Sequence, residues 1–132
     1  HEYGEIAGSD EGEEPDFHEK GDPSLRDTEA VKGYHLIASG ERVGTVDDFL
    51  ADQDQWSIRY LIIDTGGWLS GRKLIISPWW LENIDWGSSA AYAKVSAEQI
   101  KGSPEFDASE PVRREYEIAL HDYYGESGYW EA

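Results

Sequence analysis

The chain has 132 residues, which suits one compact domain with an appended segment. Its 28 acidic side chains outnumber 11 basic ones and leave a net charge of −17, which argues against a nucleic-acid partner because this surface would repel phosphates. Cysteine is absent, so disulfides, thiolate metal ligands and a cysteine nucleophile are excluded, and no apolar run reaches the roughly 18 residues that span a bilayer.

The acidic excess has two explanations. It fits a surface adapted to high salt, where carboxylates stay hydrated, and it also fits a binding face for a basic partner. The acidic residues are spread along the chain, which favours the first explanation.

The beginning of the chain differs from the rest. Residues 1–29 hold 11 acidic and 2 basic side chains and few large apolar ones, so this stretch cannot bury much surface. We assign residues 1–22 to an acidic linker or arm, and residues 23–130 to a folded domain that ends in a helix and an aromatic tail. Because the first residue is not Met, we expect the chain to be a fragment or processed product of a longer protein.

From Gly33 onward, short runs rich in β-branched and aromatic residues alternate with Gly and Asp. Six of these runs have strand length: residues 33–39, 41–52, 56–64, 72–78, 82–87 and 91–96. Short strands in such close succession predict a mainly β fold, a small antiparallel barrel or sandwich. The far half of 56–64 is apolar on both faces, so another segment must cover it.

The covering segment is predicted near the end of the chain. Pro111 suits a first helical position, and a helix that ends before Gly125 would carry one apolar stripe of Val112, Tyr116, Ala119, Leu120 and Tyr123. Ser96 and Gln99 have capping-box spacing, which predicts a short helix that Gly102 ends. The aromatic tail at 123–130 is expected to pack back onto the barrel.

Chemistry-bearing residues form no recognisable catalytic pattern. The histidines at 1, 18, 35 and 121 lack metal-ligand spacing, and we interpret them as isolated or hydrogen-bonded side chains. Asp47 and Asp48 are adjacent on a strand, so they should point to opposite faces and should not share a proton. Nucleophile elbows, Walker loops and dinucleotide fingerprints are absent. We therefore predict neither enzymatic activity nor a cofactor or metal.

The connection "DTGGWLSGR" is longer than a hairpin requires. Asp64 with Gly66 or Gly67 should shape its turn. Trp68 and Arg72 either latch the end of the barrel, which we favour slightly, or contact a partner. Tryptophan and arginine are common at interface hot spots, so the candidate interaction residues are Trp68, Arg72, Trp79, Trp80 and Trp130.

The order of these pieces resembles a known family. The run "GYHLIASGERVGTVDDFLADQDQWSIRYLIIDTGGWLSGRKLIIS", followed by "IDW", "PVRREYE" and "YYGESGYW", is similar to bacterial PRC-barrel proteins over residues 23–130. The resemblance implies a small, highly bent β-barrel and a binding or assembly role without an active site. It also implies that this chain is the C-terminal unit of a tandem PRC-barrel protein.

We therefore expect a non-enzymatic, cytoplasmic interaction module that binds a protein partner or a second copy of itself through its aromatic surface and C-terminal helix. The alternative is an accessory subunit of a membrane electron- or proton-transfer complex, like the reaction centre H subunit, whose cytoplasmic domain gives the family its name. Nothing in this chain resembles the membrane helix of that subunit, so the chain would dock on the complex without inserting into the bilayer. A small hydrolase or metal-dependent enzyme is the least favoured reading, because the site motifs are absent.

Overall fold

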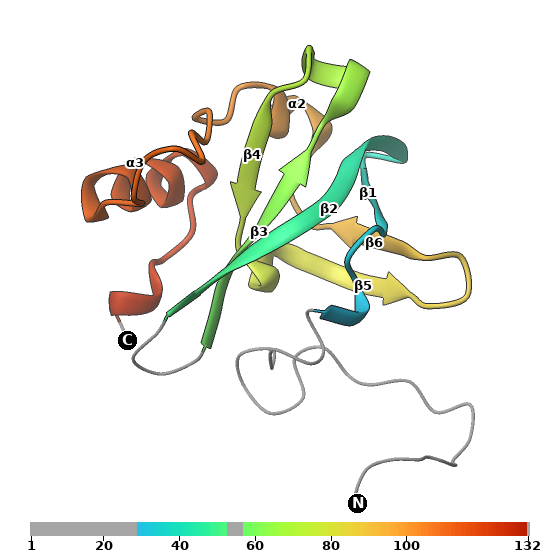
Figure 1. Ribbon diagram of the computed structural model, residues 1–132, viewed down its shortest axis with the longest axis horizontal. Helices are drawn as coiled ribbons and strands as arrows, with labels where there is room; N and C mark the ends of the chain where they lie inside the picture. Colours follow the sequence, from blue (N-terminus) through green and yellow to red (C-terminus); the bar gives the residue numbers. More distant parts are fainter. Residues whose placement is uncertain (1–28, 53–56, 132) are drawn as a thin grey trace, which may run out of the picture.

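The predicted strands form one six-stranded sheet with two helices beside it (Figure 1). The computed structural model describes residues 29–52 and 57–131, so the predicted acidic arm at 1–22 lies outside the described residues. The strands are β1 (His35–Ala38), β2 (Glu41–Asp52), β3 (Ser57–Asp64), β4 (Lys73–Ile76), β5 (Leu81–Asp85) and β6 (Ala90–Ala93). The α-helices are α2 (Ala97–Lys101) and α3 (Arg114–Tyr124), and the 3₁₀ turns are η1 (Gly66–Leu69), η2 (Pro78–Trp80) and η3 (Tyr129–Glu131).

The strand order is β4-β3-β2-β1-β6-β5, and β4 and β5 form the two ends of the sheet. The predicted mainly β class, with a bent sheet and two helices, is confirmed. Two details differ from the predicted antiparallel barrel: β1 and β6 pair in parallel while the other neighbours are antiparallel, and in the described residues the sheet is not closed, since β4 and β5 do not pair. Because of the parallel pair, the sheet is mixed. The sequence pattern of two short strands far apart in the chain does not show their relative direction, so the parallel pair was not predicted.

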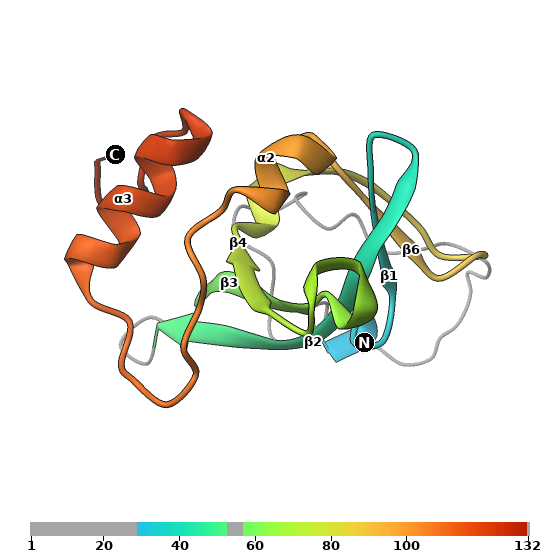
Figure 2. The ribbon, with the colours of Figure 1, turned by 90° about the horizontal axis from the view of Figure 1, so that it is seen from above.

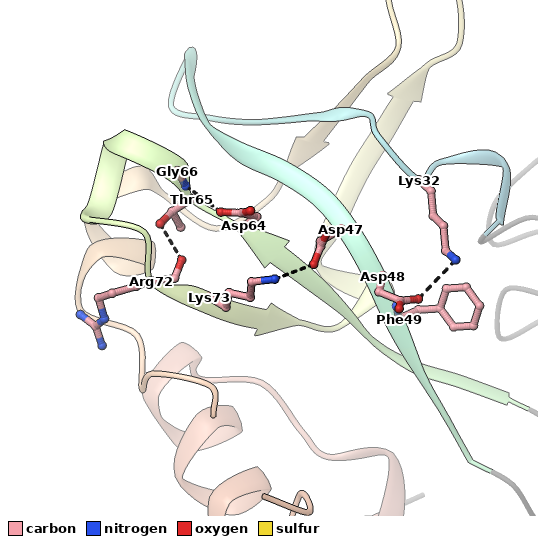
Figure 3. A network of polar contacts seen from close by, with 9 residues as sticks. All are labelled: Lys32, Asp47, Asp48, Phe49, Asp64, Thr65, Gly66, Arg72 and Lys73. Carbon is pink, nitrogen blue, oxygen red and sulfur yellow. Dashed lines mark hydrogen bonds and ion pairs between the residues drawn. The ribbon is translucent and has the colours of Figure 1, made fainter. Parts of the chain in front are cut away.

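Strand β2 makes the bend. Its first half pairs with β1 and its second half with β3, and the pairing with β3 shifts register between Val46 and Asp48. An extra residue at such a bulge bends and twists a strand. The bulge leaves Asp47 and Asp48 both exposed, where strict alternation predicted opposite faces. Asp47 accepts a hydrogen bond from Lys73 at 2.8 Å, and Asp48 pairs with Lys32 at 3.4 Å, so each carboxylate has its own lysine (Figure 3).

The core lies between the bent sheet and its covering segments. Strand β4 buries Leu74, Ile75 and Ile76 in succession, as expected of a strand covered on both faces. Ile100 of α2 and Leu120 of α3 belong to the same core. The views from the side and from above both place α3 beyond the edge strand β4 (Figures 1 and 2). The prediction that the end of the chain covers the sheet is thus confirmed.

The two helices differ in how well their ends were predicted. Helix α2 has the predicted capping box between Ser96 and Gln99 and is followed by Gly102. Helix α3 begins at Arg114 and not at Pro111, and its N-cap residue makes no side-chain cap. The predicted stripe is also partly wrong, since the buried residues of α3 are Glu117, Leu120, His121 and Tyr124. Within the described ranges, no helix is long and apolar enough to cross a membrane.

Gly44 sits where β2 passes closest to the end of β3. A Cβ at this position would lie 2.7 Å from the Asp64 carbonyl oxygen and 2.8 Å from Ile63 Cγ2. We predict that Gly44→Ala lowers the free energy of unfolding by about 2 kcal/mol, because backbone atoms must move apart. Gly87→Ala is the control, since its nearest neighbour would be at an ordinary 3.5 Å. Urea denaturation measures the free energy of unfolding of both variants. An equal loss of stability in the two would contradict the close approach at Gly44.

Candidate interaction site

The connection between β3 and β4 is a closed, hydrogen-bonded loop. Thr65 Oγ1 donates to the Arg72 carbonyl at 2.6 Å, and the Gly66 N–H donates to Asp64 Oδ1 at 2.9 Å (Figure 3). Gly66 has φ +55°, in the left-handed region that favours glycine, whereas Gly67 has no positive φ, and a Cβ at either position would meet nothing within 4 Å. Asp64 and Gly66 thus hold the turn, and Gly67 has no comparable contact.

Trp68 and Arg72 both contact other parts of the same chain. Trp68 Nε1 donates to Glu41 Oε1 at 2.9 Å, and the Lys101 ammonium lies 5.6 Å from the Trp68 ring centroid. Arg72 Nη2 donates to the Ser103 carbonyl at 3.5 Å, and the Arg72 guanidinium pairs with Glu105 at 3.8 Å. These contacts tie the loop to β2 and to the segment around α2, which favours a latch.

The adjacent tryptophans of η2 have different environments. Ser77 Oγ accepts the Trp79 N–H at 3.1 Å and Pro78 occupies the first helical position, which starts a tight turn after β4. Trp80 is only 3% exposed and packs against His121, with ring centroids 5.0 Å apart. Trp79 is 40% exposed. The turn thus places one indole in the core and the other at the surface.

Aromatic and cationic side chains also meet in the tail of the chain. The Trp130 ring lies 5.0 Å from His121, and the Arg114 guanidinium lies 4.3 Å from the Trp130 centroid. Tyr129 lies between two guanidinium groups, 4.0 Å from Arg59 and 5.6 Å from Arg114. Guanidinium groups are attracted to aromatic faces, so these contacts hold the tail against β3 and α3. The tail packs back onto the domain, as the sequence predicted.

Behind these rings is a buried hydrogen-bond network that joins β3 to α3. Tyr60 Oη donates to Glu117 Oε2 at 2.7 Å and lies 3.0 Å from His121 Nε2. Arg114 Nε donates to Glu117 Oε1 at 3.1 Å. Burial, followed by the Glu117 hydrogen bond, raises the pKa of the Tyr60 hydroxyl. The hydroxyl therefore stays protonated, and the helix is held to the sheet by charge-assisted hydrogen bonds.

His121 is held through both of its ring nitrogens. His121 Nδ1 lies 3.1 Å from the Ser127 carbonyl oxygen, which can only accept, so Nδ1 carries a hydrogen. The one hydroxyl hydrogen of Tyr60 goes to Glu117, so the Tyr60 oxygen is left to accept from Nε2. The Tyr60 hydroxyl thus joins Glu117 and His121, while the Ser127 carbonyl holds the other ring nitrogen of His121.

A cavity of about 500 Å³ opens between β3, η2, α3 and the tail. Its lining brings together Trp79 and Trp80 from the sequence prediction, while Trp68 and Arg72 belong to the loop at the other end of β3. The other lining residues were not among the predicted interaction residues, and His121 was predicted only as an isolated or hydrogen-bonded side chain. The cavity is lined by Ile58, Arg59, Ser77, Trp79, Trp80, His121, Glu126, Ser127 and Tyr129.

A sequence signal for the network does exist. Glu117 and His121 are spaced i, i+4 on either side of Leu120, so they share the face of a helix that also carries an apolar residue. Titratable groups on a buried face need polar partners. In the part of the chain that the structure describes, no three His, Asp or Glu side chains form a group that could hold a metal ion.

Comparison with known proteins identifies a domain. Residues 31–100, a little over half of the chain, match the family model of the PRC-barrel domain. A relative in Deinococcus radiodurans, described as an uncharacterized protein, is 29% identical over 77 residues. That match covers 58% of this chain and 27% of the relative, so the chain spans about a quarter of the length of the protein that it matches.

The network gives a first prediction for this site. Tyr60→Phe should lower the free energy of unfolding by about 2 kcal/mol, because a buried carboxylate and imidazole lose their shared partner. Tyr116→Phe is the matched control, since it removes a hydroxyl that donates to the neutral Pro104 carbonyl at 3.1 Å. The control should cost about 1 kcal/mol. Chemical denaturation of both variants decides the point, and a Tyr60 variant no less stable than the control would refute it.

The buried tyrosines give a second prediction. Burial raises the pKa of Tyr116 and of Tyr124 from 10.0 to about 12. Because the folded-state pKa values are raised, their contribution to stability is complete below pH 10 and is lost as the pH rises through about 12. We expect the tyrosinate absorbance of the folded protein to be incomplete near pH 10 and to keep rising as the pH passes about 12, while circular dichroism reports whether the fold persists. Complete tyrosine ionisation near pH 10 in a protein that is still folded would contradict this.

Proposed function

The chain belongs to the PRC-barrel family, and we propose that it is a non-enzymatic interaction module that associates with a second copy of itself through the surface formed by η2, α3 and η3. This surface is called the C-terminal surface below. It includes Trp79 and the exposed side of α3.

The distribution of exposed apolar side chains carries the proposal. Among the described residues, the large hydrophobic side chains that stand exposed are Trp79 at 40%, Ile118 at 44%, Tyr123 at 40% and Tyr129 at 36%. All four belong to η2, α3 or η3. Trp79 and Tyr129 line the same cavity, and Ile118 is one turn after Arg114, which contacts the Tyr129 ring. Tyr123 is on another flank of α3, where its hydroxyl donates to the Gln99 carbonyl at 2.6 Å. Exposed apolar groups are typical of protein-protein contact sites, and Trp and Tyr are favoured there.

The buried network supports a binding role over a catalytic one. Its central group, the buried Tyr60 hydroxyl, is hydrogen-bonded to both Glu117 and His121 inside the domain. Tyr60 and Glu117 do not line the cavity beside Trp79, and His121, which does, bonds through both ring nitrogens to groups of the domain itself, so the network holds α3 in place. In this proposal their role is to position the C-terminal surface.

Charge opposes association between copies. Each chain carries a net charge of −17, so two copies repel one another, and apolar burial must exceed that repulsion. Salt screens repulsion between exposed charges but leaves apolar contacts in place. Association through the C-terminal surface should therefore strengthen as the salt concentration rises.

Oligomeric state tests the proposal. We expect light scattering after size-exclusion chromatography to give twice the mass of one chain for the parent, more completely at high salt. Ile118→Glu should give the mass of one chain, because a carboxylate would then be buried against apolar groups. Asn83→Glu adds the same charge on the exposed side of β5 and should leave the dimer intact. A monomeric parent at every salt concentration, or equal loss in both variants, would show that the proposal is wrong.

A further inference from the structure

A second hollow lies on a different part of the surface, between the segment that follows α2 and the start of α3. We call it the α3 groove. Its volume is about 360 Å³, and its lining shares no residue with the cavity beside Trp79. The long connection from α2 to α3 that forms one wall is visible from above (Figure 2). The lining residues are Glu105, Phe106, Asp107, Glu110, Pro111, Val112, Arg113, Glu115 and Tyr116.

The walls of the α3 groove are fixed by hydrogen bonds to the rest of the domain. The Phe106 N–H donates to the Lys73 carbonyl at 3.0 Å, which attaches the 104–107 segment to the edge strand β4. Tyr116 Oη donates to the Pro104 carbonyl at 3.1 Å, which joins α3 to the same segment. The groove is thus present before any partner binds, and binding would order little additional chain.

The floor of the groove is apolar. Phe106 is part of the buried core, and Val112 and Tyr116 are half-buried and pack against that core. Pro111 is exposed beside them. The lining therefore offers a place for an apolar side chain on a rigid base.

The rim of the groove is acidic. Four of its nine lining residues are carboxylates, Glu105, Asp107, Glu110 and Glu115, against the single cation Arg113. Glu105 also pairs with Arg72 at 3.8 Å. Ser109 donates to Asp107 from its hydroxyl and its N–H, and these bonds hold the pKa of Asp107 below its usual value. The rim is therefore strongly negative at neutral pH.

We propose that the α3 groove binds a basic segment of another protein, with an apolar side chain on the floor and flanking lysines or arginines at the acidic rim. Charge complementarity selects this occupant. Residues 1–29 of this chain carry 11 acidic and 2 basic side chains, and a second copy carries a net charge of −17, so both are repelled by the rim. The proposal goes beyond self-association, because the α3 groove does not include the apolar residues of the C-terminal surface.

Fluorescence anisotropy tests the groove with two labelled octapeptides. The first, Lys-Lys-Leu-Lys-Lys-Phe-Lys-Lys, has charge and apolar side chains, and in the second the Leu and Phe are replaced by Ser. Titrations at about 0.15 M salt limit attraction at long range, because the Debye length is then about 8 Å. We expect the parent protein to bind the first peptide about tenfold more tightly than the second peptide. This difference corresponds to burial of one or two apolar side chains. Equal affinity for both peptides, or binding of neither, would overturn the proposal.

Charge-reversal variants locate the binding. Glu110→Lys with Glu115→Lys should weaken binding of the first peptide about tenfold, because two rim charges become repulsive. Glu82→Lys with Glu98→Lys is the matched control, because it makes the same change in net charge. The helix positions also match, since Glu98 lies in the first turn of α2 and Glu115 in the first turn of α3. The control should stay within about twofold of the parent. Equal losses would show attraction to overall charge alone, and a changed oligomeric mass in the rim variant without peptide would assign the groove to contact between copies. Either result would refute the proposal.

Discussion

The hydroxyl of Tyr60 is the point at which the sheet and the C-terminal helix are joined. It donates to Glu117 at 2.7 Å and lies 3.0 Å from His121, so one side chain of β3 engages two consecutive turns of α3. Both partners are buried, and a buried carboxylate or imidazole without hydrogen bonds is costly. With the Glu117 and His121 face turned inward, the Tyr60 hydroxyl removes this cost for both side chains.

The inward face of α3 decides what the protein presents to its surroundings. With Glu117, Leu120 and His121 turned inward, Ile118 and Tyr123 are left at the surface, where an unbroken apolar stripe would have buried Tyr123. The same placement sets the start of α3 against the segment after α2 and so forms the α3 groove. Both proposed binding surfaces therefore depend on one internal network.

The two surfaces differ in physical character, and this separates their partners. The C-terminal surface is rich in exposed aromatic and aliphatic groups, so association there is driven by apolar burial and favoured by salt. The α3 groove combines an apolar floor with a negative rim, so binding there is weakened by salt. Under the two proposals, self-association and uptake of a basic segment would use separate surfaces and would not compete. The acidic composition fits the second role as well as it fits a high-salt environment.

The sequence by itself determined the features that depend on neighbouring residues: the six strand-length runs, the capping box at Ser96, the Asp64 turn and the need for a cover over β3. These follow from alternation, capping and turn chemistry, which act over a few residues. The tertiary structure alone decided the parallel pairing of β1 with β6, the bulge that exposes both Asp47 and Asp48, and the inward face of α3. The hydrophobic pattern predicted that α3 buries an apolar stripe. In the structure α3 buries a face that includes Glu117 and His121, which bond to Tyr60 of β3. Contacts between residues far apart in the chain decide such choices, and no local pattern records them.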